Sequence, residues 1–385
     1  MKKVIDIEAC CGCGACSEIC PKKCISMESD IEGFLYPNID EDTCIHCGQC
    51  NEVCPFQQTK EITEENISAF AAQSKDICLR MNSSSGGIFP ELAKYFLDNN
   101  GVVVGASFSD DFSEVIHIIS DSTKTVSSLF GSKYVQSRMT LYKSILEHLN
   151  NGTSVLFSGT PCQINALKLF LKRDYDNLLC VAVICHGVPS PLLWSKYINS
   201  VCGKKKITSV NFRAKPNGWS NFEMSIKFSK GKTISQHHAN NIYFHFFLKD
   251  INLRPSCYSC NIKLHTCSTD LFLGDLWGGA KIMSDFADDL GTSFVVTTSK
   301  KGSEYLDKIA DKIAIAPIDL TESIKHNPTL CSCQKYNPKR DDFYKDLNAL
   351  PFRKFIKKYD SRSKSQKIKM LVKSFIRKSN NFKGV

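Results

Sequence analysis

The chain carries one cysteine-rich pattern twice, as CCGCGACSEICP at residues 10–21 and as CIHCGQCNEVCP at residues 44–55. Each run separates three cysteines by two residues and adds a fourth after three more, directly before a proline, which is the bacterial iron–sulfur ligand pattern. Glycines within the runs allow the tight turns that neighbouring thiolates around one cubane require. The fourth cysteine of such a run ligates the other cluster of a two-cluster ferredoxin. We therefore predict two 4Fe-4S clusters, one held by Cys10, Cys13, Cys16 and Cys54 and the other by Cys44, Cys47, Cys50 and Cys20.

Zinc is the main alternative to iron–sulfur ligation, because cysteine pairs separated by two residues also build structural zinc sites. Zinc ribbons have a long spacer between two such pairs and lack a third cysteine at the same two-residue spacing. The chain opens with MKKVIDIE, which contains no apolar segment of signal-peptide length. We therefore expect a cytoplasmic protein. Its 20 cysteines are then metal ligands or buried thiols, not disulfides.

The positive charge of the chain is concentrated at its C-terminal end. The net charge is +10, and residues 351–385 alone hold twelve Lys or Arg and one acid, Asp360. The rest of the chain is close to neutral, which argues against nucleic acid as a partner. One helical face of the tail is apolar, with Ile368, Leu371, Val372, Phe375 and Ile376. This pattern is typical of a helix on an anionic membrane surface, or of a helix packed on the body or on a partner.

The length of 385 residues suits two or three domains. We divide the chain into a dicluster domain at residues 1–60, two parts of a second domain at 61–155 and 156–340, and a basic amphipathic tail at 341–385. The expected fold is an α+β ferredoxin-like dicluster domain followed by a mixed α/β flavin and iron–sulfur domain. Hydrophobic patterns predict helices at 140–150 and Asn240–Lys249. They predict strands at Ile67–Gln73, Val102–Phe108, Val115–Ile119, Val155–Ser158, Leu179–Ile184, Phe222–Ser229, Lys232–Gln236 and Ser293–Ser299.

Two polar loops are candidate cofactor contacts. The first, with Ser84, Ser85, Gly86 and Gly87, runs directly into an amphipathic helix. Exposed amides at such a helix start favour an anion, so this loop predicts either a flavin pyrophosphate site or an ordinary capped helix. The candidate residues of the second loop are Ser132, Lys133, Tyr134 and Ser137. Lys133 could bind a phosphate and Tyr134 could stack on a planar ring, or the segment is an ordinary exposed loop.

A further set of cysteines predicts a third 4Fe-4S cluster. Cys162 and Cys185 each follow the carboxyl end of a predicted strand, which is where an α/β sheet presents functional groups. Thr160 and Pro161 suit a helix start, so Cys162 lies in the first turn, where the helix dipole favours a thiolate. Together with the lone pair Cys257 and Cys260 they form a quartet. Alternative ligands are Cys267, Cys331 and Cys333, and the cysteines expected to be buried thiols are Cys11, Cys24, Cys78, Cys180 and Cys202.

These motifs together resemble the beta subunits of coenzyme F420 (deazaflavin) hydrogenases and dehydrogenases. The resemblance covers roughly residues 60–340 and rests on SSGGIF at 84–89, GSKYVQS at 131–137, FSGTPCQ at 157–163, CHGVPS at 185–190, and Cys257-x2-Cys260 followed by GDLW at 274–277. It implies a bound flavin, FAD in most members, beside a cluster held by the quartet, with the two polar loops as flavin contacts. The fused cysteine runs make the chain more similar to stand-alone bacterial members, several of which resemble enzymes of surface-glycan synthesis.

The sequence therefore supports two functions of different classes. The first is an iron–sulfur flavoprotein oxidoreductase that takes electrons from a partner such as ferredoxin and passes them to an organic substrate, since clusters move single electrons and most organic reductions need two. His186 is a weak candidate proton donor; a structural or ligand-orienting histidine is the commoner role. The alternative is a non-catalytic electron-transfer subunit of a partner enzyme. A zinc module that binds nucleic acid through the basic tail is the least favoured interpretation.

Overall fold

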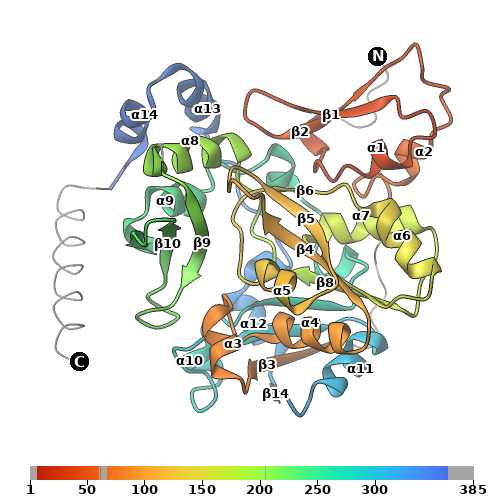
Figure 1. Ribbon diagram of the computed structural model, residues 1–385, viewed down its shortest axis with the longest axis vertical. Coiled ribbons are helices and arrows are strands. Elements are labelled where there is room, and N and C mark those ends of the chain that lie inside the picture. Colours follow the sequence, from red (N-terminus) through yellow and green to blue (C-terminus); the bar gives the residue numbers. More distant parts are fainter. Residues whose placement is uncertain (1–6, 60, 62–66, 204, 363–385) are drawn as a thin grey trace.

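The computed structural model describes residues 7–59, 61, 67–203 and 205–362. At the N-terminal end a small cysteine-rich domain packs on one corner of the body (Figure 1). It consists of η1 (Ile7–Ala9), α1 (Ala15–Ile19), β1 (Ile25–Ser29), β2 (Leu35–Ile39) and α2 (Gln49–Glu52), with β1 and β2 antiparallel. Both short helices begin at a glycine in the left-handed region, Gly14 with φ 79° and Gly48 with φ 76°. These are the tight turns that the glycines between the cysteines predicted.

The body is built on a mixed nine-stranded sheet with the order β14-β3-β13-β12-β8-β7-β4-β5-β6. The four strands β12, β8, β7 and β4 at its centre are parallel, whereas β13, β3 and β14 on one side and β5 on the other pair antiparallel with their neighbours. The strands are β3 (Ser68–Ser74), β4 (Val102–Phe108), β5 (Val115–Ser120), β6 (Ser137–Arg138), β7 (Val155–Gly159), β8 (Leu178–Val183), β12 (Leu271–Asp275), β13 (Ser293–Thr297) and β14 (Ile313–Pro317). The mixed α/β body that the sequence predicted is confirmed, and each strand predicted in this sheet is found within two residues.

Helices cover both faces of this sheet, because side chains alternate between the faces along each strand. On β4, Val103 packs in a core with α4 (Ile88–Asp98) and α11 (Lys300–Lys308), whereas Val102 and Val104 pack with α6 (Tyr142–Asn150) and α7 (Pro161–Leu171). The remaining short helices of the body are α3 (Ile77–Asn82), α5 (Thr123–Val126), η2 (Ser127–Leu129), η4 (Pro255–Ser259), η5 (Leu264–Thr266), α10 (Gly279–Ile282), α12 (Leu320–His326) and η6 (Pro328–Leu330).

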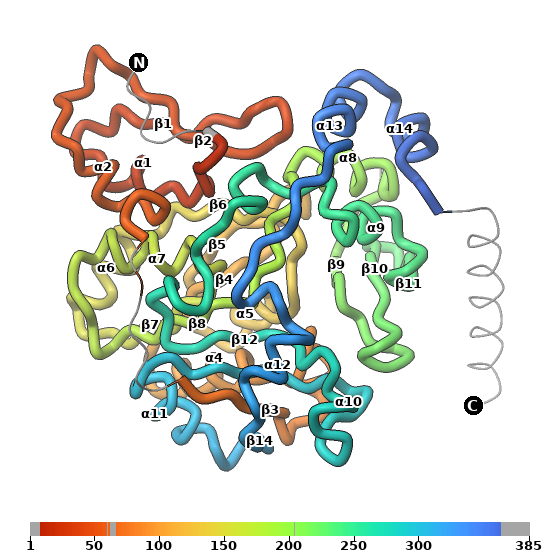
Figure 2. Tube along the Cα trace, turned by 180° about the vertical axis from the view of Figure 1, so that it is seen from behind, coloured from red at the N-terminus to blue at the C-terminus, as the bar shows by residue number. Residues whose placement is uncertain are grey.

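A second, three-stranded antiparallel sheet stands beside the large one and carries its own aromatic core. Its strands are β9 (Ile207–Ala214), β10 (Glu223–Phe228) and β11 (Thr233–His237), and the predicted hairpin is confirmed as β10 and β11. The helices packed with it are α8 (Pro191–Cys202), η3 (His238–Asn240) and α9 (Ile242–Leu248). Seen from behind, the chain after β14 runs along the large sheet and returns to this smaller unit (Figure 2).

The C-terminal region begins as part of the folded body. The predicted tail starts at residue 341, yet the structure forms α13 (Arg340–Ala349) and α14 (Phe352–Tyr359) there. Their residues Phe343 and Phe355 are 0% exposed, so they belong to the core of the smaller unit. The apolar face predicted at Ile368–Ile376 lies outside the described residues. Within the part of the chain that the structure describes, no helix has the length and apolar content needed to cross a bilayer.

Candidate metal centre and adjoining cleft

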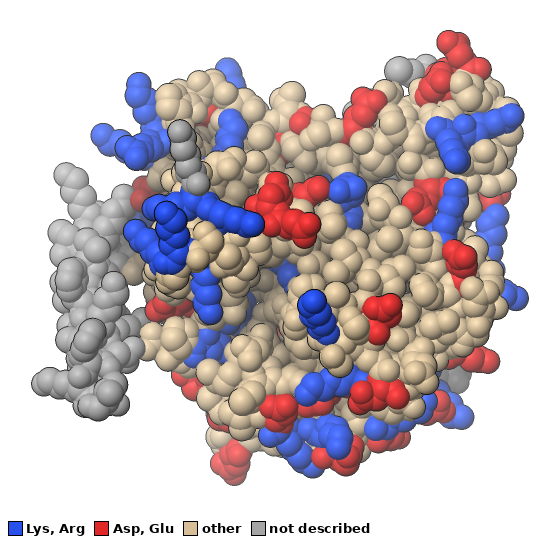
Figure 3. Space-filling view, in the orientation of Figure 1, with Lys and Arg blue, Asp and Glu red and all other residues tan. Residues whose placement is uncertain are grey.

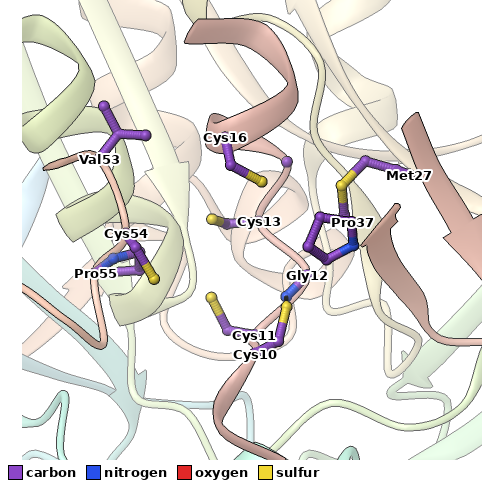
Figure 4. Close-up of a pocket in the computed structure, with 11 residues that line it drawn as sticks. Cys10, Cys11, Gly12, Cys13, Cys16, Met27, Pro37, Val53, Cys54 and Pro55 are labelled. Atoms are coloured by element: carbon purple, nitrogen blue, oxygen red, sulfur yellow. Dashed lines mark hydrogen bonds between the residues drawn. The ribbon is translucent and has the colours of Figure 1, made fainter. Parts of the chain in front are cut away.

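The inner cysteine cavity lies where the small domain meets the body. Cys10, Cys13, Cys16 and Cys54 line it, together with Cys11 and apolar neighbours such as Met27, Pro37 and Val53 (Figure 4). Its walls thus offer sulfur donors in an apolar setting, which suits an iron–sulfur cluster. Burial raises the pKa of Cys54 to about 11 and also raises the pKa of Cys16. A metal cluster that binds here must therefore displace protons from the thiols.

The outer cysteine cavity lies farther from the body and is more open to solvent. Cys20, Cys44, Cys47 and Cys50 line it, and Cys47 is exposed. Polar side chains are present as well, including Lys22, Glu41 and His46. The structure therefore brings together the same two quartets that the crossed ligand pattern predicted. That each quartet holds a 4Fe-4S cluster stays a prediction.

The sequence did not single out the extra cysteine in each cavity. Cys11 lines the inner cavity, and Cys24 lines the outer one with its sulfur 3.4 Å from that of Cys20. Among the described residues, no three His, Cys, Asp or Glu side chains lie close enough together to hold a single metal ion. Ligands of a cubane stand farther apart than ligands of a single ion, because four irons and four sulfides fill the space between them.

Three body residues hold the backbone of the inner ligand run. The Tyr142 hydroxyl donates to the carbonyl of Cys13 at 2.8 Å, and the Gln136 amide donates to the carbonyl of Cys11 at 2.8 Å. The Arg254 guanidinium donates from Nε to the carbonyl of Cys10 at 2.6 Å. Because all three contacts are made to backbone carbonyls, they fix the backbone of the inner run against the body.

The predicted third set of cysteines lies next to the inner cavity. Cys162 follows β7 in the first turn of α7, and Thr160 with Gln163 forms the capping box of that helix. The neighbouring thiols of Cys13 and Cys162 raise the pKa of Cys11, and the neighbouring thiol of Cys11 lowers the pKa of Cys162 to about 7. The Cys11 thiol and the backbone amide at the start of α7 both lower the pKa of Cys162. The proximity of Cys11 to Cys162 joins the inner cavity to the third set.

The other members of the third set converge on Cys162. Burial raises the pKa of Cys185 to about 12, and the nearby thiols of Cys162 and Cys260 raise it further. Burial also raises the pKa of Cys257, and here the charges of Cys185, Cys162 and Cys260 contribute. A side chain at Gly187, which has φ +137°, would come within 3.3 Å of the Cys257 Cβ. Glycine at this position therefore lets the Cys185 loop approach the Cys257 loop closely.

The alternative ligands occupy different positions. The Cys267 thiol is 1% exposed and donates to the carbonyl of Pro161 at 3.7 Å. Cys333 donates to the carbonyl of Tyr258 at 3.1 Å, and its charge influences Cys260. Cys331 is exposed.

Five other cysteines were expected to be buried thiols. Cys11, Cys24, Cys180 and Cys202 are buried, whereas Cys78 is exposed, so the expectation for Cys78 is wrong. Cys78 lies near the start of the short surface helix α3, whose single-sided packing the sequence pattern did not reveal.

The two predicted flavin loops meet each other. The backbone amide of Ser132 donates to the Ser84 hydroxyl at 2.7 Å. Gly86 donates its own amide to the Ser293 hydroxyl at 3.0 Å, and the Ser85 hydroxyl donates to the carbonyl of Thr292 at 2.8 Å. The first loop is therefore pinned to β13. No described contact yet assigns these loops a cofactor, so flavin binding stays a prediction.

The other residues of the second loop have partners within the protein. The Lys133 amine donates to the carbonyls of Ser128 and Phe130, and burial lowers its pKa to about 7. The Tyr134 ring packs against Phe212, Phe244 and Phe247. Ser137 accepts a hydrogen bond from the Gln163 amide at 3.1 Å, which places it beside the Cys162 turn.

A polar and aromatic cluster beside these loops was missed by the sequence analysis. Arg213 at the end of β9 pairs with Asp275 at the end of β12 at 3.0 Å, and the Trp219 indole donates to Asp275 at 2.9 Å. The ring centroids of Trp219 and Trp277 lie 4.7 Å apart, and Trp277 is 43% exposed. The Lys215 amine donates to the carbonyl of Ser85 at 3.1 Å. The GDLW motif that contains Asp275 and Trp277 was the available signal, although the sequence analysis used it only for the family resemblance.

This cluster joins β9 of the three-stranded sheet to β12 of the large sheet. The surface is hollowed between the three-stranded sheet and the large sheet, and Lys or Arg side chains reach into the hollow (Figure 3). Burial lowers the pKa of Lys215 to about 8. Polar loops, a cation and aromatic rings thus lie together at this junction of the two sheets.

His186 follows the third-set residue Cys185 and has partners on both ring nitrogens. Its Nε2 lies 2.6 Å from the Asp250 carboxylate, and its Nδ1 lies 3.2 Å from the Gln334 amide. A histidine held on both sides orients the loop that carries it. A role as proton donor to a substrate stays a prediction.

Comparisons with known proteins agree with both halves of this description. Residues 9–58 match the family model of the 4Fe-4S dicluster domain, and residues 152–322 match that of the C terminus of the coenzyme F420 hydrogenase/dehydrogenase beta subunit. No curated protein matches the chain. Among solved structures, a chain of the xenon-derivatised F420-reducing [NiFe] hydrogenase complex from Methanosarcina barkeri is 17% identical. The alignment covers 70% of this chain and 91% of that chain, with a TM-score of 0.45.

The two family matches account for the cysteine cavities and for the region that holds the third set and the cleft. The chain therefore joins a region similar to 4Fe-4S dicluster domains, at residues 9–58, to a region similar to the C terminus of the coenzyme F420 hydrogenase/dehydrogenase beta subunits, at residues 152–322.

Proposed function

We propose that this protein is an iron–sulfur flavoprotein oxidoreductase. In this proposal the outer quartet receives electrons from a ferredoxin-type partner, and the inner quartet and the third set carry them to a flavin in the cleft. When bound, the clusters move single electrons and the flavin pairs them for the two-electron reduction of an organic substrate. The resemblance to stand-alone bacterial members extends the proposal to a substrate from surface-glycan metabolism.

One observation carries the proposal: the three sets of thiols are contiguous. The outer and inner quartets share one small domain, Cys11 lines the inner cavity, and the thiols of Cys13 of the inner quartet and Cys162 of the third set both neighbour Cys11. Cys162 lies in the first turn of α7, and Gln163 beside it donates to Ser137 of the second polar loop. A continuous line of sulfur ligands that reaches the loops of a cleft is the arrangement that delivers electrons to an organic cofactor.

The residues of the chain have distinct tasks in this scheme. The quartets and Cys162, Cys185, Cys257 and Cys260 would hold metal, and Ser84–Gly87 with Ser132–Ser137 would line the flavin site. Lys215 donates to the carbonyls of Arg80, Ser85 and Leu290, and so fixes the first loop relative to β9. The Arg213–Asp275 pair and the two tryptophans would border the substrate end of the cleft.

Anaerobic purification followed by stepwise reduction tests this proposal. We expect a bound flavin whose absorbance bleaches after the cluster absorbance begins to fall, and we expect Cys162→Ala to uncouple the two signals. A sample that holds clusters but no flavin after reconstitution with FAD and FMN would overturn the enzymatic scheme.

A second candidate is an electron-transfer subunit without catalysis of its own. The family match favours it, because the description names a subunit. The exposed Trp277 would then face a partner enzyme. Turnover of a small substrate by the isolated chain distinguishes the two candidates, since a subunit requires its partner for any turnover.

A further inference from the structure

Arg254 is a buried cation at the junction of the small domain and the body. Its side chain is 0% exposed. The guanidinium donates to the carbonyls of Cys10 and Leu35 at 2.6 and 2.8 Å, and to the Gln136 amide oxygen at 2.9 Å. It also stacks on Tyr36, with 4.1 Å between the guanidinium carbon and the ring centroid. The three oxygen atoms that accept hydrogen bonds from it are therefore neutral.

A buried guanidinium is unfavourable unless a negative charge compensates it. Across the residues that the structure describes, no carboxylate forms an ion pair with Arg254. The chain does provide such partners for its other buried arginines: Arg80 pairs with Asp288, Arg213 with Asp275 and Arg340 with Glu32. Arg254 is thus the exception, and its counter-charge must come from something other than a side-chain carboxylate.

The position of Arg254 identifies that counter-charge. Its guanidinium contacts the backbone of Cys10 in the inner quartet, and three residues later the same chain segment supplies Cys257 of the third set. A 4Fe-4S cluster with four thiolate ligands carries net negative charge, and this charge grows by one on reduction.

We propose that Arg254 is the counter-charge of the inner cluster and raises the reduction potential of that cluster relative to the outer one. An electron that enters at the outer quartet is then favoured to move inward, because the cation stabilises the reduced state beside it. This inference rests on the inner cluster of the proposed function and does not require the flavin. Net charge, hydrogen bonds and exposure are the factors by which proteins set cluster potentials.

Two pairs of variants separate the charge of Arg254 from its structural role. Arg254→Gln removes the charge, and Arg254→Lys keeps it while losing the forked hydrogen bonds. Gln136→Glu places a carboxylate beside the Arg254 Nη1 group and so supplies the missing partner. Gln136→Leu removes the same amide contacts without adding a charge. Each full-length variant is reconstituted anaerobically and titrated, and the cluster midpoints are followed by electron paramagnetic resonance. The signal that disappears in Cys47→Ala marks the outer cluster as an internal reference.

We expect Arg254→Gln and Gln136→Glu each to lower the inner midpoint by about 59 mV, a tenfold change in the one-electron equilibrium. Arg254→Lys and Gln136→Leu should change this equilibrium less than twofold, so that the inner midpoint shifts by less than about 18 mV. The outer midpoint should also shift by less than about 18 mV in all four variants. Equal shifts within either pair, or no shift in Gln136→Glu, would overturn the proposal, and so would an inner quartet that binds no cluster. If Arg254→Gln does not assemble, the Gln136 pair decides alone. A chain with clusters but no flavin refutes the enzymatic function and leaves this test intact.

Discussion

The two cysteine cavities share one ligand pattern but differ in their surroundings. The inner quartet is packed against the body, with Cys10 and Cys13 buried and Tyr142, Gln136 and Arg254 bound to its backbone. The outer quartet has an exposed Cys47 and polar neighbours. The comparison teaches that the spacing of cysteines marks the two quartets, whereas the tertiary contacts give one quartet a buried setting and the other an exposed one. In the proposed scheme, this difference assigns the outer quartet to the donor and the inner one to transfer toward the body. The following predictions test this difference.

Loss of one ligand from each quartet should have the largest effects. In Cys13→Ala the electron path is cut at the junction with Cys162, so a reduced ferredoxin should still reduce the outer cluster. Reduction of the flavin should slow at least about 100-fold, or about 2.7 kcal/mol in the barrier. Stopped-flow absorbance measures both steps. In Cys47→Ala the outer signal itself should be lost. Unchanged flavin reduction in Cys13→Ala would show that electrons bypass the inner quartet.

The equivalent glycines of the two runs provide a matched pair. Gly14 and Gly48 both begin a short helix at positive φ, so alanine at either costs about 1–2 kcal/mol. At Gly48 an added Cβ meets nothing within 4 Å, whereas at Gly14 it comes within 2.7 Å of the Met139 carbonyl oxygen. Overpacking against the body then adds about 1–3 kcal/mol for Gly14→Ala. Equal losses of unfolding free energy in urea would contradict the tighter packing of the inner site.

The hydrogen bond from Tyr142 to the Cys13 carbonyl should have the smallest effect of the three. Tyr142 is 0% exposed, so Tyr142→Phe leaves that carbonyl unpaired. We expect a loss of about 1 kcal/mol in unfolding free energy, together with a change in the spectrum of the inner cluster. Tyr175→Phe is the control, because its hydroxyl bonds to Asn150 outside the cysteine cavities. A spectral change in the control, or none in Tyr142→Phe, would count against a specific contact.

The ligand quartets could be predicted from the sequence because each consists of short, regular spacings. The strands β4 and β7 were equally accessible, since their apolar runs are continuous and short. Arg254, Arg213 and Asp275 could not be found in this way. Arg254 acts on a residue 244 positions away, and Arg213 pairs with Asp275 across two different sheets. Contacts of this kind depend on how the sheets pack together. Local periodicity in the sequence does not predict that packing.

The C-terminal region shows a related limit of sequence analysis. Basic composition predicted a tail from residue 341, whereas Phe343 and Phe355 are fully buried in α13 and α14. Their partners are aromatic residues of the smaller unit, such as Phe246. Surface charge on a helix therefore did not reveal the apolar side that packs on the body. The exposed Cys78 illustrates the converse, because a single cysteine has no pattern from which its burial could be predicted.

The stoichiometry of iron, sulfide and flavin in the anaerobically reconstituted chain tests the central claim most directly, with Cys162→Ala measured beside the unaltered protein. The account predicts about twelve irons, twelve sulfides and one flavin per chain, and about eight irons in the variant, because three quartets would each hold a 4Fe-4S cluster. About eight irons in both proteins, with no flavin retained, would contradict a sulfur-ligand path that reaches from the dicluster domain into the cleft.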